Sequence, residues 1–427
     1  LFKDAEGKQE TTLEAEVVPA EGHTMVKTEA VAPTYFAPGN NEYYTCSVCG
    51  KVYKDAEGLT ETTVADETLA TLSSAASGKF GRDDCLSWVL TEDGTLTISG
   101  SGMIPNYSET ITAPWYAKRM KITSVVVESG VTYVGSYAFN ACLKLTSVDL
   151  PAGVIGISSF AFQNCSKLTS VKIPASVKSI DQGAFYGCTG LESVTLPENA
   201  YIGSRNERGY SDKGVFEACT GLTSVTVLAG ARFTQNTFAG CTSLTSISIP
   251  ESMTEIPHGS FKGCTGLTSV TIPKSVTKIA NFAFSGCTSL TGVTIPDGVT
   301  SVGHRAFEEC SGLTNVHIPD SVVSIGTYAF YRCSGLKSIR LPEGITSIGQ
   351  YTFYGCASLE SVTIPDGVTS IDEDAFYDCA GMVNVHIPEG VVSIAWGAFA
   401  NCSSLKSVII PETVTSIGAS AFSGCTA

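Results

Sequence analysis

The sequence is poor in charged residues and especially poor in basic ones. Charged side chains make up 16% of its 427 residues, and 26 Lys and Arg stand against 41 Asp and Glu, for a formal net charge of −15. Proteins that bind nucleic acid display a basic patch or stripe, so this composition argues against such a partner. No apolar run approaches the ~20 residues that a membrane-spanning helix needs, and we therefore expect no membrane insertion within this chain.

Motifs for catalysis are also missing. The chain has 5 His, and no motif places a nucleophilic Ser, Thr or Cys beside a base. The adjacent acids Glu373 and Asp374 are most simply a solvated turn. We predict that the chain is not an enzyme and that it uses no cofactor.

What the chain does contain is one short phrase, repeated thirteen times. Its form is Leu-x-x-Val-x-Ile-Pro-x-x-Val-x-x-Ile-x-x-x-Ala-Phe-x-x-Cys, and ten of the twelve intervals between copies are 23 residues long. A fixed period of this length indicates a solenoid, in which each copy is one coil that buries its apolar face against its neighbours. The closing cysteines of the copies are Cys142, Cys165, Cys188, Cys219, Cys241, Cys264, Cys287, Cys310, Cys333, Cys356, Cys379, Cys402 and Cys425.

The coil over residues 267–287 illustrates the expected local structure. Val270 and Ile272 alternate with polar residues, which is typical of a strand with one solvent-exposed face. Pro273 ends that strand because it cannot donate to the ladder, and eleven of the thirteen copies have Pro here. A second short run over residues 276–279 again points Val and Ile inward, and the Phe and the closing Cys of the repeat follow.

This spacing resembles the BspA-type class of bacterial leucine-rich repeats, found on surface and secreted proteins. The match covers about residues 122–425 and departs from the commoner repeat, since Val and Ile replace most leucines and a second strand-like run replaces the Asn turn. The resemblance implies a curved, β-rich solenoid of about 13 coils. It further implies adhesion or protein recognition at the bacterial cell surface or outside the cell, without naming the partner. We expect that partner to be an extracellular protein or glycan.

The thirteen cysteines at one coil position are expected to be free, buried thiols. Free Cys packs as a small hydrophobe. Neighbouring coils should lie ~4.8 Å apart, a distance that does not itself forbid disulfides. However, the Cβ vectors of stacked coils are parallel and thirteen is an odd number, so free thiols are favoured although the expected compartment is oxidising.

Residues 1–64 form a different unit. The stretch Phe2–Gly7 recurs as Tyr53–Gly58, so the chain begins within a first, truncated copy, and we expect it to be part of a longer polypeptide. Cys46 and Cys49 lie between the copies in Cys-x-x-Cys-Gly, which resembles small modules found in tandem on Gram-positive surface proteins.

Two thiolates at this spacing can reach one tetrahedral metal ion, so Cys46 and Cys49 are weak candidates for zinc ligands. A structural zinc site needs four ligands, and His23 and Cys85 are the only further candidates nearby. A disulfide or a reduced pair in a small spacer module is the favoured alternative.

A linker and a cap are expected before the repeats. Residues 65–81 are rich in Ala, Ser and Thr and predict a linker. Residues 82–121 predict a capping hairpin, because Asp93-Gly94 separates two alternating runs as in a type I′ turn. Trp115 should help to cover the first coil of the solenoid, which we place at residues 122–427.

Two surfaces of the solenoid are candidates for partner binding. One is the outward face of the strands, mostly small and hydroxyl-bearing, with the larger candidates His317, Arg340 and His386. The other is the rim beside the repeated Phe, where the candidates are Tyr328, Tyr331, Tyr351, Tyr354, Tyr377 and Trp396. Tyr and Trp often anchor interfaces and also stack on sugars. The alternative is that these rings only pack along their neighbours and cover the Phe residues.

Two further possibilities remain open. The insertion at residues 198–213 lengthens one coil and is either a partner contact or neutral variation. We predict that the solenoid is a recognition scaffold, which the aromatic rim favours; the alternative is a passive stalk that presents another domain, which the uniform Ser and Thr face favours.

Overall fold

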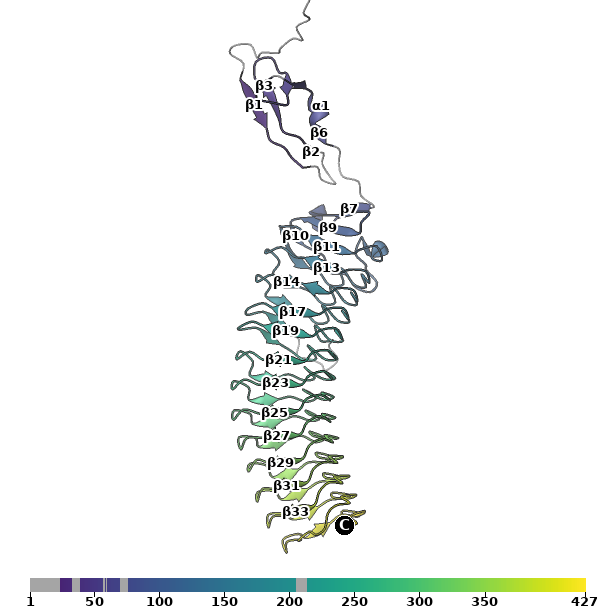
Figure 1. Cartoon of the computed structure of the whole chain (residues 1–427), viewed down its shortest axis with the longest axis vertical. Coiled ribbons are helices and arrows are strands. Elements are labelled where there is room, and N and C mark those ends of the chain that lie inside the picture. Colours follow the sequence, from purple (N-terminus) through teal and green to yellow (C-terminus); the bar gives the residue numbers. More distant parts are fainter. Residues whose placement is uncertain (1–23, 33–38, 57, 59, 70–75, 205–212) are drawn as a thin grey trace, which may run out of the picture. The chain divides into compact units, whose positions relative to one another are not determined.

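The computed structural model describes residues 24–32, 39–56, 58, 60–69, 76–204 and 213–427, and these form two compact units, Leu1–Ser77 and Gly78–Ala427 (Figure 1). The first unit has a four-stranded antiparallel sheet in the order β1-β3-β4-β5 and a β2-β6 pair. Its elements are β1 (Met25–Thr28), β2 (Gly39–Asn40), β3 (Tyr43–Cys46), β4 (Val52–Tyr53), β5 (Glu61–Thr62), α1 (Val64–Glu67) and β6 (Thr68–Leu69).

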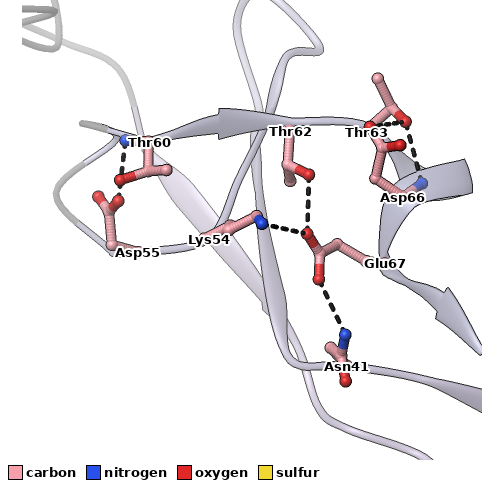
Figure 2. A network of polar contacts seen from close by, with 8 residues as sticks. All are labelled: Asn41, Lys54, Asp55, Thr60, Thr62, Thr63, Asp66 and Glu67. Atoms are coloured by element: carbon pink, nitrogen blue, oxygen red, sulfur yellow. Dashed lines mark hydrogen bonds and ion pairs between the residues drawn. The ribbon is translucent and has the colours of Figure 1, made fainter.

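A buried carboxylate ties this unit together (Figure 2). Glu67 accepts hydrogen bonds from Thr62 Oγ1 at 2.7 Å and Asn41 Nδ2 at 3.2 Å, and Lys54 Nζ lies 3.6 Å from its Oε1. These partners hold the pKa of Glu67 below its ordinary value. The expected linker therefore begins later than residue 65, because α1 and β6 pack into the unit through contacts that the local composition does not reveal.

The second unit opens with the predicted hairpin. It contains β7 (Ala76–Phe80), the 3-10 turn η1 (Arg82–Asp84), β8 (Leu86–Leu90) and β9 (Thr95–Gly100), and β9 pairs in parallel with the strand of the next coil. The turn type was predicted wrongly. Gly94 has φ +90 but Asp93 does not have positive φ, and Gly94 N donates to Thr91 O. The turn is therefore type I followed by a left-handed glycine, because the loop has three residues rather than two.

Every coil except the last contributes two short strands, and the last contributes only the second of them. Strands of each kind pair in parallel with those of neighbouring coils, with some interruptions (Figure 1). The first strands are β11 (Ser124–Val127), β13 (Ser147–Asp149), β15 (Ser170–Val171), β17 (Ser193–Leu196), β19 (Ser224–Val227), β21 (Ser246–Ser248), β23 (Ser269–Thr271), β25 (Gly292–Thr294), β27 (Asn315–His317), β29 (Ser338–Arg340), β31 (Ser361–Thr363) and β33 (Asn384–His386).

The second strands start at the capping segment, which also has the 3-10 turn η2 (Tyr116–Lys118). They are β10 (Gly102–Met103), β12 (Val131–Val134), β14 (Gly156–Ile157), β16 (Ser179–Ile180), β18 (Tyr201–Ile202), β20 (Arg232–Phe233), β22 (Glu255–Ile256), β24 (Lys278–Ile279), β26 (Ser301–Val302), β28 (Ser324–Ile325), β30 (Ser347–Ile348), β32 (Ser370–Ile371), β34 (Ser393–Ile394) and β35 (Ser416–Ile417). The predicted β-rich solenoid is thereby confirmed.

Two internal ladders hold the coils together. The repeated Phe rings stack from Phe139 to Phe422, with centroids 5.1–5.8 Å apart. From Cys165 to Cys425 each closing thiol donates to the carbonyl of the Phe one coil earlier, at 3.0–3.3 Å. The repeat cysteines are free, as expected, and all but the last are buried.

Candidate partner-binding rim

The rim lies on the turn between the second strand and the Phe of each coil. In twelve of the thirteen coils the residue two positions before the Phe has φ between +51 and +63. Glycine accepts this backbone without strain, and the chain places Gly183, Gly259 and Gly397 there. Tyr328 and Tyr351 occupy the same position although a bulky side chain at positive φ is a genuine outlier, so neighbouring contacts must compensate the strain.

Those contacts are ring stacks between successive coils. Tyr328 stacks on Tyr351 with centroids 4.6 Å apart, and the second column runs Tyr331–Tyr354–Tyr377 with separations of 5.0 and 4.8 Å. Tilted contacts of 5.5 Å (Tyr328–Tyr331) and 5.9 Å (Tyr351–Tyr354) join the columns. The five half-buried tyrosines thus form one aromatic patch, which we call the tyrosine rim. The structure brings together these candidates, which the sequence had only placed in successive coils.

Basic side chains cover the N-terminal end of the tyrosine rim, and the sequence analysis missed them. The guanidinium of Arg305 lies 4.4 Å from the ring centroid of Tyr328 and 5.9 Å from that of Phe282. Arg305 Nη1 pairs with Glu308 at 2.6 Å, and its Nε donates to His304 Nε2 at 3.0 Å. Burial and Arg305 lower the pKa of His304, which is consistent with a neutral ring that accepts this hydrogen bond. The sequence did contain one signal for this contact: Arg305 stands one repeat before Tyr328, and a cation next to an aromatic ring can form a cation–π contact.

The C-terminal end of the tyrosine rim is acidic. Tyr351 Oη donates to Glu373 Oε1 at 3.3 Å, and the backbone N–H of Asp374 donates to the carbonyl of Trp396 at 3.0 Å. Asp374 is 4% exposed, and burial and the neighbouring Glu373 raise its pKa. Trp396 lies outside the stacked columns and is 48% exposed. The expectation that Glu373 and Asp374 are a simple solvated turn therefore fails for Asp374, because the next coil covers it.

The three candidates on the strand face are exposed but are not brought together. His317 and His386 end β27 and β33, three coils apart. Arg340 forms ion pairs with Asp320 at 2.9 Å and Glu343 at 3.3 Å, so carboxylates of the adjoining turns already neutralise it. The face is thus a set of separate side chains on a hydroxyl-rich sheet.

The Cys-x-x-Cys turn folds around one sulfur. The backbone N–H groups of Val48 and Cys49 both donate to Cys46 Sγ at 3.4 Å, and Gly50 closes the turn at φ +73. Among the described residues, no group of three or more His, Cys, Asp or Glu side chains gathers where a metal ion could bind. His23 lies outside the described residues, so zinc binding by Cys46 and Cys49 stays a weak prediction.

A hollow of 470 Å³ accompanies the irregular coil. It lies where the second column of strands is interrupted between β20 and β22, and its lining includes Arg232, Phe233, Glu255 and Lys278. The nearby insertion falls largely on residues 205–212, outside the described part of the chain, and its predicted partner role stays a prediction. In the described parts of both units, no helix has the length and apolarity to cross a membrane.

Comparisons with known proteins agree with this architecture. The family model of the BspA type leucine rich repeat region (6 copies) matches residues 109–229, 210–337 and 300–427, well over half of the chain. A leucine-rich repeat protein from Bacteroides ovatus is similar at 28% identity and a TM-score of 0.69, over 83% of this chain and 92% of that one. A leucine-rich repeat protein from Eubacterium ventriosum shares 24% identity and a TM-score of 0.50, over 83% and 96% of the two chains, and supports the fold alone. No curated protein sequence matches.

Proposed function

Because the chain belongs to the BspA-type leucine-rich repeat family, we propose that it is a recognition scaffold at the bacterial surface or outside the cell. Its partner is an extracellular protein, bound through the tyrosine rim. Solenoids of this class are typically non-catalytic scaffolds, and they offer a long rigid surface on which side chains of successive coils align.

The observation that carries this proposal is the stack of tyrosines on strained backbone. Tyr328 and Tyr351 keep φ of +60 and +58 at a position where three coils use glycine and where Tyr137, Phe160 and Phe282 also place rings. Such strain persists only where something compensates it, and it often coincides with function. Tyrosines that support one another in this way are rigid anchors, which lose little entropy when a partner binds.

The ring geometry favours a protein over a glycan. A sugar ring packs on an open aromatic face, whereas the faces of Tyr354 lie against Tyr331 and Tyr377, and Tyr328 lies between Arg305 and Tyr351. Apart from Tyr377, whose column ends at Ala400, these rings offer mainly their edges and phenol hydroxyls to solvent. Edges and hydroxyls suit the mixed apolar and hydrogen-bonding contacts of a protein interface.

A passive stalk is the second candidate, and one observation favours it. Threonine hydroxyls beside the first strands donate to the carbonyl one coil earlier, as in Thr268 to Thr245 and Thr314 to Thr291, both at 3.0 Å. These hydroxyls stabilise the stack itself, so their repetition needs no ligand to explain it.

The deciding experiment is a binding screen of the full chain against extracellular-matrix proteins, mucins and arrayed glycans. The rim variant combines Tyr328→Gly, Tyr351→Gly and Trp396→Ala, and the control variant changes Thr271 and Thr363 on the strand face to Ala. A protein ligand that is lost only in the rim variant supports the proposal. A ligand lost only in the control variant, a glycan that depends on the tyrosine rim, or no ligand at all overturns it, and the last result favours the stalk.

A further inference from the structure

The tyrosine rim ends in a notch next to acidic side chains. Tyr377 is the last ring of its column because the next coil has Ala400 at that position. In the neighbouring column Gly397 follows Asp374, and a Cβ on Gly397 would collide with Asp374 Oδ1. The carboxylate of Asp374 therefore lies in the space that a side chain at position 397 would take, next to the ring of Tyr377.

The polar atoms of this notch are incompletely satisfied. Asp374 Oδ1 is buried and has no hydrogen-bond partner among the described residues. A buried carboxylate oxygen without a donor is costly, so it is a place where a ligand that brings N–H groups gains free energy. Glu373 lies beside it, half-buried, and receives the Tyr351 hydroxyl at 3.3 Å and the Gln350 amide at 3.5 Å.

Charge is unbalanced only at this end of the tyrosine rim. Arg305 and Arg332 are already paired with Glu308 and Glu309. By contrast, no described cation forms an ion pair with any acid of the coil that ends at Cys379, namely Glu360, Asp366, Asp372, Glu373, Asp374 and Asp378. A cation from outside the chain would meet uncompensated negative charge here.

We propose that the notch formed by Glu373, Asp374, Tyr377 and Trp396 is the subsite for an arginine side chain of the protein partner. A planar guanidinium stacks on aromatic rings and has enough N–H groups to serve two carboxylates at once, which a compact ammonium does less well. The half-buried Glu373 and the exposed Trp396 receive it first, and the unpartnered Oδ1 of Asp374 then accepts a hydrogen bond from it. This inference rests on the proposed function and names the partner chemistry at the same site.

The test uses the full chain and the peptide tetra-arginine, with tetracitrulline as the uncharged isostere. Binding is followed by fluorescence, because Trp88 and Trp115 are buried and Trp396 is the half-exposed indole. We expect Asp374→Asn and Glu373→Gln each to weaken tetra-arginine binding at least ~10-fold, the effect of losing one charged hydrogen bond in a desolvated site. Asp366→Asn, an exposed acid on the turn after the first strand, is the charge-matched control and should change the affinity less than ~2-fold, since it removes only diffuse attraction to the net charge.

Asp374→Asn should fold normally, because the chain itself places Asn236 over Gly259 at the same repeat position.

Equal binding of tetra-arginine and tetracitrulline, or equal losses in Asp374→Asn and Asp366→Asn, would overturn the subsite. An Asp374-dependent rise in the melting temperature with millimolar Ca²⁺ but not with tetra-arginine would also overturn it, in favour of a metal site. If a screened partner needs the tyrosine rim but binds Asp374→Asn normally, the subsite fails while the proposed function stands. If tetra-arginine binds through Asp374 but no partner needs the tyrosine rim, the proposed function fails while the arginine subsite stands.

Discussion

The indole of Trp115 stacks on the ring of Phe139, with centroids 5.6 Å and planes 20° apart, and its Nε1 donates a hydrogen bond of 2.8 Å to the carbonyl of Ala138. Trp115 thereby takes the place of a Phe one coil before the ladder begins. Solenoids need atypical terminal coils to cover the apolar surface of their stack. At the N-terminal side of the repeats, Trp115 provides this cover by stacking on Phe139.

Removing the indole should open this end of the solenoid. We expect Trp115→Ala to lower the free energy of local opening by about 3–5 kcal/mol, as for other buried aromatic truncations, and to promote aggregation. Hydrogen exchange of the amides in β9 and β11 measures the effect. Trp396→Ala, at a half-exposed indole, is the control and should leave that exchange unchanged; equal exchange in both variants would contradict the capping role.

The core and the tyrosine rim should respond differently to truncation. Phe330 is fully buried between Phe307 and Phe353, so Phe330→Ala should cost about 3–5 kcal/mol. In Tyr351→Gly the lost stacking of about 0.5–1.5 kcal/mol is offset by relief of about 1–2 kcal/mol of left-handed strain. Denaturant unfolding should therefore show a change of less than about 1 kcal/mol for Tyr351→Gly. If both variants unfold equally early, the rim tyrosines belong to the core.

The thiol ladder should make the solenoid sensitive to alkali. Burial raises the pKa of Cys264 and Cys310 from 9.0 to about 12. The folded state therefore holds these protons more tightly than the unfolded state does. The resulting stability is complete below pH 9 and is lost as the pH rises towards 12, at about 1.4 kcal/mol per unit for each thiol.

Alkaline unfolding followed by circular dichroism checks this dependence. A variant with Cys264→Ala and Cys310→Ala should show a shallower loss of stability between pH 9 and 11, whatever its stability at pH 7. Alkylation at pH 7.5 is the independent measurement: the exposed Cys49 and Cys85 should react quickly, and the ladder cysteines only after unfolding. Rapid alkylation of the ladder in the folded chain would refute the account.

Asp374 should destabilise the folded chain at neutral pH. Its pKa is raised by burial and by Glu373, so the folded state binds this proton more tightly than the unfolded state. The stability that this proton confers is present below the ordinary pKa of 3.8 and disappears as the pH rises through the folded value. Asp374→Asn should therefore have a higher melting temperature than the wild type at pH 7 and the same one near pH 3; a lower value at pH 7 would contradict the sign.

Much of the fold could be predicted because the same local residue pattern recurs in thirteen copies. The alternation around Val270 and Ile272 predicts an inward-facing strand, and Pro273 predicts its end. The free thiols followed from the same repetition, since stacked side chains point in parallel. The type I′ turn at Asp93-Gly94 was wrong because the loop length depends on where the two strands pair, which the dipeptide does not specify.

The candidate site was predicted less well. The sequence singled out Tyr328, Tyr351 and Trp396 by residue type, but it could not show that the tyrosines stack, that Arg305 covers one end or that Arg340 is already paired. It also treated Asp374 as solvated. Each of these outcomes depends on contacts between residues 20 to 23 positions apart, which no local pattern displays.

The sequence by itself determined the coil, its strands, its Phe and Cys ladders and the family, because a buried apolar face repeated every 23 residues can be satisfied only by stacking. Tertiary structure alone decided how the candidate surfaces are built. Whether a tyrosine presents a face or an edge, and whether a carboxylate finds a donor, depends on what the next coil places above it. At the end of the tyrosine rim the next coil places Gly397 and Ala400 there, so that the Asp374 carboxylate fills the place of one side chain and the column of rings ends at Tyr377.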